Sequence, residues 1–136
     1  MKNKDVGNFC ENICKNTLNN LGYNILRSNY YSRYGEIDVI VQKDGIIAFV
    51  EVKARKIGSL VKPKEAVDKR KMEKIIKTAY QFLIDFDEYK FGNLQPRFDV
   101  FEVYFQYSKD DFIKINKINH IENAFDLDSV NLDFGF

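Results

Sequence analysis

GEIDVIVQKDGIIAFVEVKAR, residues 35–55, is the stretch that decides the fold of this chain. Within it, Asp44-Gly45 separates two runs that are rich in β-branched residues. Asp-Gly between such runs is the strongest short-range signal for a β-hairpin with a two-residue turn. This turn pairs Lys43 with Ile46, so the numbers of all directly opposed residues sum to 89.

The same register brings two acidic residues face to face. Asp38 lies opposite Glu51, in the class of antiparallel pair whose Cα atoms approach to about 4.5 Å. Two such carboxylates repel each other unless they share a proton or bind a cation. Oxygen ligands favour hard divalent ions, so Mg²⁺ or Mn²⁺ is the expected cofactor. Lys53 points the same way and can hold a water or balance a phosphate, which completes the equipment for phosphodiester hydrolysis.

An antiparallel hairpin often has one solvated face, and the acidic face could be only that. Ile40 and Phe49 share this face, however, and indicate that it is partly covered and that the carboxylates lie in a cleft. The opposite face is apolar and is expected to form the core: Ile37, Val39, Val41, Ala48, Val50 and Val52.

Outward from the hairpin, the sequence predicts two main helices. Apolar residues at helical spacing, closed by Gly22, predict a helix over about 6–21, with Glu11 at the edge of its apolar stripe. A second helix is predicted over about 69–86, with Asp68 as its N-cap. The other expected elements are strands at 23–29, 97–105 and 112–118, and a short helical turn at about 120–125. This is an α/β (α+β) pattern.

The length of 136 residues, 45% of them apolar, suits one domain with a continuous core. No apolar run approaches the roughly 20 residues of a membrane helix, and no secretion signal is evident, so no membrane and a cytoplasmic location are expected. Residues 1–125 are expected to form the domain. Residues 126–136 are expected to form an acidic tail that frays or packs loosely.

Two groups of residues have both a structural and a chemical interpretation. Cys10 and Cys14 are four apart on the first helix, where buried thiols are favoured over metal or redox chemistry. Asp99 lies in an apolar run and needs a partner, for which Arg97 or Lys71 is favoured over a catalytic role. The single histidine, at position 120, is expected to be a surface or capping residue.

Positive charge is concentrated in one part of the chain. Residues 53–77 carry 10 basic and 3 acidic side chains, whereas residues 110–136 carry 2 and 6. A basic field of this kind suits a phosphate backbone, and a solvated helix face is the alternative. The tyrosine-rich segment 30–34 could stack on bases or pack as an edge strand. The residues expected to contact nucleic acid are Arg55, Lys69, Arg70, Lys71, Lys74, Tyr31 and Arg33.

The ordered motifs resemble the YraN-like bacterial family of predicted endonucleases, within the PD-(D/E)XK nuclease superfamily. The resemblance rests on Gly35–Asp38, Phe49–Lys53 with Arg55, Glu11, Gly22-Tyr23 with Ile25-Leu26 and Asn29, Ala66–Asp68 with Lys71, Arg97–Val100, and Ile121–Phe125. It implies a restriction-endonuclease-like mixed sheet with a central hairpin flanked by two main helices, similar to that of archaeal Holliday-junction resolvases.

The resemblance also implies roles for individual residues. Asp38, Glu51 and the Val52 carbonyl would be metal ligands, and Lys53 would be the catalytic lysine. Glu11 would be the helical acid of resolvase-like members. Glu36 would either contact the metal ligands without touching the ion or bind a second metal ion.

The leading hypothesis is therefore a Mg²⁺- or Mn²⁺-dependent endonuclease acting on DNA, including branched or otherwise structured DNA. The alternative is a non-catalytic nucleic-acid-binding or interaction module that retains the nuclease fold. The expected partner is nucleic acid, with DNA favoured over RNA. A homodimer and a monomer are both compatible with the sequence.

Overall fold

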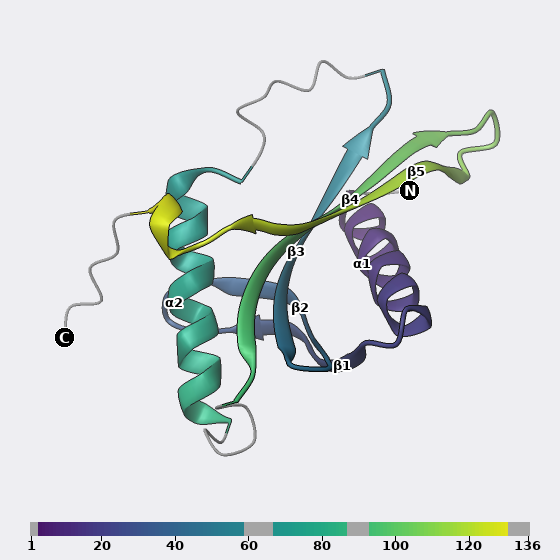
Figure 1. Cartoon of the computed structure of the whole chain (residues 1–136). Coiled ribbons are helices and arrows are strands. Elements are labelled where there is room, and N and C mark those ends of the chain that lie inside the picture. The colour runs from purple at the N-terminus through teal and green to yellow at the C-terminus, as the bar shows by residue number, and fades with distance from the viewer. Residues whose placement is uncertain (1–2, 59–66, 87–92, 131–136) are drawn as a thin grey trace.

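The computed structural model describes residues 3–58, 67–86 and 93–130. In this part of the chain, one mixed sheet has a helix on each face (Figure 1). Its elements, in chain order, are α1 (Asn3–Asn20), β1 (Asn24–Tyr31), β2 (Glu36–Lys43), β3 (Ile46–Lys56), α2 (Lys69–Asp85), β4 (Gln95–Tyr107), β5 (Ile113–Phe125) and the 3₁₀ helix η2 (Leu127–Ser129).

The strands follow the order β1-β2-β3-β4-β5 across the sheet. β3 and β4 are parallel, and the other neighbours are antiparallel. α2 lies between β3 and β4 in the chain and provides the crossover that a parallel pair requires. The expected restriction-endonuclease-like α/β architecture is confirmed. Across the described residues, no helix combines the length and the apolar character needed to cross a membrane.

α1 covers one face of the sheet and ends as the sequence predicts. Cys10, Cys14 and Leu18 are fully buried against that face, so the interpretation of the cysteines as core residues is confirmed. Burial raises the pKa of the Cys10 thiol to about 11 and raises the pKa of Cys14 as well. Gly22, at φ 96°, follows the helix in the left-handed conformation that glycine adopts easily.

α2 covers the other face of the sheet. It begins at the predicted N-cap, where the Asp68 carboxylate accepts a hydrogen bond from Lys71 N at 2.8 Å. Phe82, which packs with Ile40 and Phe49, is 1% exposed. The two hairpin residues are themselves fully buried. The face of the hairpin that carries Asp38 and Glu51 is therefore not solvated. Near the turn, Ile40 and Phe49 on this face are part of the hydrophobic core under α2.

One residue of the hairpin faces the other way from the prediction. Ile37 was expected beside Val39 and Val41, but it packs in the α2 cluster, whereas the two valines pack under α1. Strict alternation along β2 fails at this point because the strand is irregular around Asp38, as described below.

β5 differs most from the prediction. The short helical turn expected at 120–125 is wrong, since these residues continue β5 and pair with β4. Ile121 lies opposite Val100, and Phe125 lies opposite Phe98. After β5 the chain turns through η2, and Val130 returns to the core under α2. The rest of the acidic tail, residues 131–136, lies outside the described residues.

Candidate active site

The hairpin has the predicted register up to the acidic pair. Five pairs, from Lys43 with Ile46 to Val39 with Val50, have numbers that sum to 89. The ladder stops there, and the next position on each strand is Asp38 and Glu51. Instead of continuing the ladder, the Asp38 carboxylate accepts a hydrogen bond from Val52 N at 2.8 Å. The strands thus part at this point and leave the two carboxyl groups close enough for each to affect the pKa of the other.

The Val52 carbonyl is directed toward the opening between the strands. In an extended strand, the N–H and C=O of one residue point to the same neighbouring strand. Because Val52 N meets Asp38, the carbonyl of Val52 also points toward β2, beyond the last ladder pair. Asp38, Glu51 and this carbonyl therefore present three oxygen donors at one place, which is the donor set of a hard divalent ion.

The carboxylate pair, Asp38 and Glu51, lies where a charge is costly. Glu51 is only 6% exposed. Burial first, and then the charge of Asp38, raise the pKa of Glu51 to about 7. Burial also raises the pKa of Asp38, although the hydrogen bond from Val52 N opposes this shift. The pair in the metal-free protein is therefore expected to retain a proton near neutral pH.

Two lysines from different elements partly compensate this charge. Lys53 Nζ, on β3, lies 3.7 Å from Glu51 Oε1, and Lys71 Nζ, on α2, lies 3.6 Å from the same oxygen. The side chain of Lys53 is 28% exposed and that of Lys71 is 42% exposed, so both can also reach solvent or a ligand. Lys71 was predicted as a nucleic-acid contact or a partner of Asp99, and the structure places it at Glu51 instead.

α1 brings a further carboxylate to the edge of the site. Asn29, at φ 52°, donates from Nδ2 to Glu36 Oε1 at 3.1 Å and to Glu11 Oε1 at 3.3 Å. Burial, followed by the charge of Asp38, raises the pKa of Glu11. The charge of Glu36 raises the pKa of Tyr31. The structure thus gathers Glu11 and Glu36 beside the carboxylate pair, and Asn29 is the residue that links them.

The candidate metal site combines two side-chain ligands with one main-chain oxygen. Within the described part of the chain, no three His, Cys, Asp or Glu side chains converge as a ready-made metal site. The predicted ligand set needs only two side chains, because its third oxygen comes from the main chain. Two buried carboxylates and a carbonyl fit a divalent ion that keeps several of its waters, as Mg²⁺ does.

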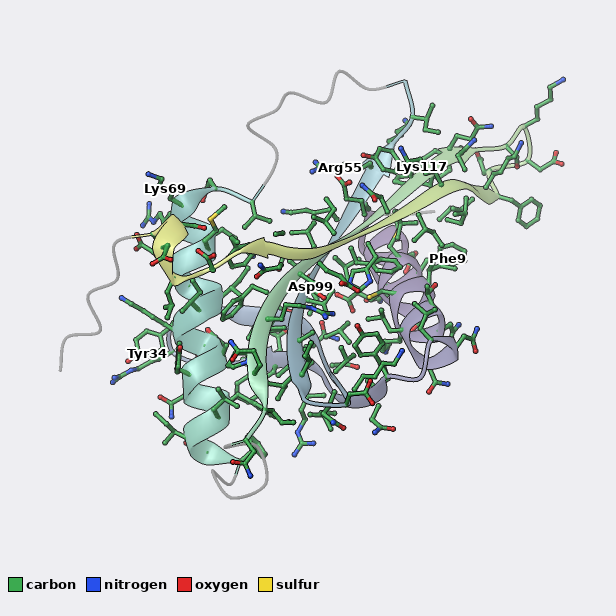
Figure 2. All side chains as sticks on the ribbon, viewed as in Figure 1. Phe9, Tyr34, Arg55, Lys69, Asp99 and Lys117 are labelled. Carbon is green, nitrogen blue, oxygen red and sulfur yellow. The ribbon has the colours of Figure 1, made fainter. Side chains whose placement is uncertain are left out.

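Most of the predicted nucleic-acid contacts lie together on one surface. Lys69, Arg70 and Lys74 are exposed on the first half of α2. Arg33 lies over the ring of Tyr34, 4.9 Å from its centroid, and Figure 2 shows Tyr34 alongside α2. We call this surface the basic face: Arg33, Lys69, Arg70 and Lys74.

The turn between β1 and β2 is held against α2. Ser32 Oγ lies 2.9 Å from Thr78 Oγ1. A Cβ atom at Gly35 would lie 3.2 Å from Lys74 Cβ, so the absence of a side chain at Gly35 permits the close approach. Tyr31, 67% exposed, is the last residue of β1, and the charge of the nearby Glu36 raises its pKa. The basic face is therefore continuous with the acidic site.

Arg55 is placed differently from the other basic residues. It is only 9% exposed, and its Nε lies 3.2 Å from Glu102 Oε2 on β4. Asn119 Nδ2 donates to the other oxygen of Glu102 at 3.0 Å. Arg55 is thus part of a buried ion pair on the same face of β3 as Glu51 and Lys53.

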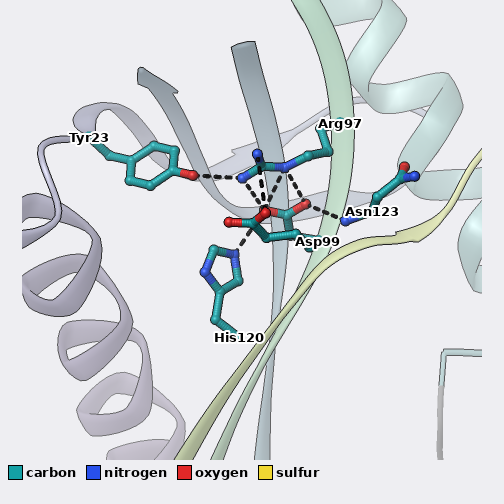
Figure 3. A network of polar contacts seen from close by, with 6 residues as sticks. Tyr23, Arg97, Asp99, His120 and Asn123 are labelled. Atoms are coloured by element: carbon teal, nitrogen blue, oxygen red, sulfur yellow. Dashed lines mark hydrogen bonds and ion pairs between the residues drawn. The ribbon is translucent and has the colours of Figure 1, made fainter. Parts of the chain in front are cut away.

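A second polar cluster lies on the α1 side of the sheet (Figure 3). Arg97 binds Asp99 through both Nε and Nη2, at 2.8–3.2 Å, and donates to the Tyr23 hydroxyl at 2.7 Å. His120 Nε2 lies 2.9 Å from Asp99 Oδ2, and Asn123 N donates to Asp99 Oδ1 at 3.0 Å. The predicted pairing of Asp99 with Arg97 is confirmed. The prediction for His120 is wrong, because its side chain is largely buried against Asp99.

Sequence comparison matches most of this chain to a defined family. A model of the uncharacterised protein family UPF0102 matches residues 10–103. The chain belongs to the UPF0102 family. The UPF0102 protein of Sulfurihydrogenibium sp. (strain YO3AOP1) is 39% identical to it over 94% of this chain and 100% of the relative. The UPF0102 protein of Caldanaerobacter subterraneus subsp. tengcongensis is 41% identical, covering 90% and 95%, and that of Caldicellulosiruptor bescii is 40% identical, covering 92% and 100%.

Membership of UPF0102, the YraN family, confirms the resemblance seen in the sequence. The UPF0102 match begins just before Glu11 and ends just after Glu102. It thus contains the carboxylate pair, both lysines and Asn29, and it ends before β5. Asn29 was not predicted as a site residue, although an asparagine inside a strand pattern is a signal for a left-handed residue.

The raised pKa of Glu51 predicts how the stability of the metal-free UPF0102 protein depends on pH. A carboxyl whose pKa rises from 4.5 to about 7 on folding stabilises the folded state fully below pH 4.5. This contribution is lost as the pH rises through 7, at up to about 1.4 kcal/mol per pH unit. We expect a lower free energy of unfolding at pH 8 than at pH 5 in EDTA, and a smaller difference in Glu51→Gln.

Urea unfolding at the two pH values measures this difference. Asp99, whose pKa is lowered by His120 and Arg97 although burial opposes the shift, affects stability only at more acidic pH. It therefore does not disturb this window. Equal pH dependence in wild type and Glu51→Gln would show that Glu51 is not the group that titrates.

Proposed function

We propose that this UPF0102 protein is a Mg²⁺- or Mn²⁺-dependent endonuclease that hydrolyses phosphodiester bonds in DNA, including branched or structured DNA, in the cytoplasm. The observation that carries the proposal is the buried carboxylate pair, Asp38 and Glu51, with Lys53 and Lys71 both close to Glu51 Oε1 and the Asp38 carboxylate bonded to Val52 N. A structural role alone gives no reason to bury two carboxyl groups against each other at this cost.

Each residue of the candidate active site would have a distinct role. Asp38, Glu51 and the Val52 carbonyl would hold the ion, which when bound supplies Lewis-acid polarisation of the phosphate and a more acidic water. Lys53 would orient the attacking water from the exposed side of Glu51. Lys71 would leave its ion pair with Glu51 for a phosphate oxygen. Glu11 and Glu36, linked by Asn29, would add negative charge beside Asp38, which favours binding of a cation there.

A second candidate is a nucleic-acid-binding module that does not cleave. It is favoured by the contacts of Glu51 with both lysines, because they satisfy this carboxylate without an ion. The two candidates are separated by incubating the protein with single-stranded, duplex, junction and RNA substrates in Mg²⁺, Mn²⁺ or EDTA. Metal-dependent cleavage that Glu51→Gln loses supports the nuclease. Binding without cleavage of any substrate supports the module.

The basic face should bind the phosphate backbone in either case. Lys69→Glu with Lys74→Glu is expected to weaken DNA binding by about tenfold or more at low salt. It should also reduce the slope of log affinity against log salt by about two, since each lysine releases about one counterion. Fluorescence anisotropy titrations at several salt concentrations measure both quantities.

The matched control changes Lys109 and Lys114 to Glu, at the far end of the β4–β5 hairpin. This variant has the same net charge but should keep most of the affinity. Equal losses in the two variants would mean that the protein responds to total charge, and that the basic face is a solvated helix surface.

A further inference from the structure

A pocket of about 220 Å³ lies on the α2 side of the sheet, between the N-terminal end of α2 and the last residues of β5. Most of its walls are apolar, and two charged side chains complete them. Its lining consists of Val67, Met72, Val100, Ile121, Ala124, Phe125, Arg55 and Glu102. Arg55 and Glu102 are each only 9% exposed. Figure 2 shows Arg55 on β3, toward the β4–β5 hairpin.

The pocket shares a wall with the candidate active site. In the parallel register of β3 and β4, Glu51 lies beside Val100, and Lys53 lies beside Glu102. Directly paired residues project from the same face of a sheet, so Val100 and Glu102, which line the pocket, are immediate neighbours of Glu51 and Lys53 in the candidate active site. Lys71, in contact with Glu51, precedes Met72, which lines the pocket.

We propose that this pocket holds one nucleobase of the DNA strand whose phosphate lies at the carboxylate pair. The inference rests on the proposed function and adds a substrate contact to it. Two lining residues, Val100 and Glu102, are the strand neighbours of Glu51 and Lys53, so a group attached to the bound phosphate is the one most readily delivered to the pocket. The space is below the roughly 300–1,000 Å³ of sites for drug-sized ligands and suits a single ring system.

The chemistry of the walls matches that of a base. A base has apolar faces, which gain from contact with side chains such as Met72 and Ile121. Its edge carries hydrogen-bond donors and acceptors. Arg55 offers donors and Glu102 offers acceptors at the same wall, and their ion pair at 3.2 Å fixes them relative to each other. Asn119 holds Glu102 from the other side. These residues are positioned to influence which base is accepted.

The test compares two single strands of equal length, an oligothymidylate and the same backbone with abasic residues throughout. Binding is measured by anisotropy in EDTA, so that cleavage plays no part. Wild type is expected to bind the oligothymidylate about tenfold more tightly. Ala124→Phe places a ring at the exposed mouth of the pocket, and Ile121→Trp fills the pocket from the same strand. Each should reduce the tenfold preference to near unity while leaving affinity for the abasic strand unchanged.

Two controls show where the preference arises. Ala54→Phe makes the same substitution on the α1 side of β3 and should retain the preference. Tyr31→Ala should also retain it. If Tyr31→Ala removes the preference and both pocket variants keep it, the bases stack on the exposed tyrosine and the proposal is overturned.

Failure of this proposal is distinguishable from failure of the proposed function. Equal binding of both strands by wild type overturns the base pocket and leaves backbone binding and metal-dependent cleavage intact. Absence of binding to either strand, together with absence of cleavage across the substrate panel, overturns both.

Discussion

Lys53→Met should reduce metal-dependent cleavage by at least about a hundredfold while leaving metal binding largely intact. An aligned proton-transfer or charge-stabilising group contributes on the order of 10²–10⁴ in rate. Lys53 can make this contribution because its ammonium is 3.7 Å from Glu51 and its side chain remains 28% exposed. Methionine keeps most of the side-chain volume and removes only the charge, so the fold should be unaffected.

The measurement is a single-turnover cleavage assay in Mn²⁺, combined with thermal melts with and without the ion. Lys56→Met is the matched control. It lies on the same strand, on the opposite face, near the N-terminal part of α1. Its cleavage rate should match that of wild type. If Lys53→Met cleaves as fast as wild type, Lys53 only neutralises Glu51, and Lys71 becomes the candidate for the catalytic lysine.

Glu51→Gln should remove the response of the fold to metal. An ion that binds only the folded protein stabilises it by about 2.7 kcal/mol at a hundred times its Kd, which for a chain of this size is roughly 10 °C in Tm. In wild type the ion would replace the shared proton and relieve the repulsion between Asp38 and Glu51. Glutamine retains the shape of the side chain but provides one neutral oxygen, so the shift with Mn²⁺ should be close to zero.

Glu73→Gln is the control, because it removes a carboxylate from α2 that has no contact with the pair. Its Tm should rise with Mn²⁺ as in wild type. A wild-type protein that shows no shift up to millimolar Mn²⁺ would remove the basis for a metal site. A Glu51→Gln shift as large as that of wild type would place the ion elsewhere.

The hairpin could be predicted in detail because its signals are local. Asp44-Gly45 fixes the turn, the turn fixes the register, and the register fixes which residues oppose each other. The packing of α2 against the hairpin could not be predicted in the same way. Phe82 and its neighbours on α2 bury Ile40 and Phe49, and no property of residues 35–55 reveals where a later helix will pack.

Two errors have a common physical cause. Ile121 and Phe125 are four apart, a spacing that places residues on one face of a helix and also on one face of a strand. Pairing with β4 selects the strand, and Asn123, at φ 52°, accommodates an irregularity in it. Likewise, Ile37 packs on the α2 side at the point where the β2–β3 ladder ends and the Asp38 side chain accepts a hydrogen bond from Val52 N. Irregularities of this kind are set by tertiary contacts, which a periodic pattern does not contain.

The location of the Lys71 ammonium could not be predicted either. Within the sequence it is one of several lysines near the start of α2, and its special position depends on the crossover from β3 to β4. By contrast, the metal ligands proposed from the family resemblance required no tertiary information beyond the hairpin. The position of Asp38, Glu51 and Lys53 thus follows from the local hairpin, whereas the position of Lys71 follows from the packing of α2 against the sheet.

The Asp99 cluster also has a consequence for how the chain matures during synthesis. The partners of this fully buried carboxylate come from positions 97, 120 and 123, and Tyr23 extends the same network to the beginning of β1. A ribosome-bound chain that has released residues up to 110 already contains every proposed ligand and lysine, but Asp99 still lacks two of its partners. We therefore expect the sheet to become stable only when β5 has emerged, so that a nascent chain would remain inactive until residues 113–125 have left the ribosome.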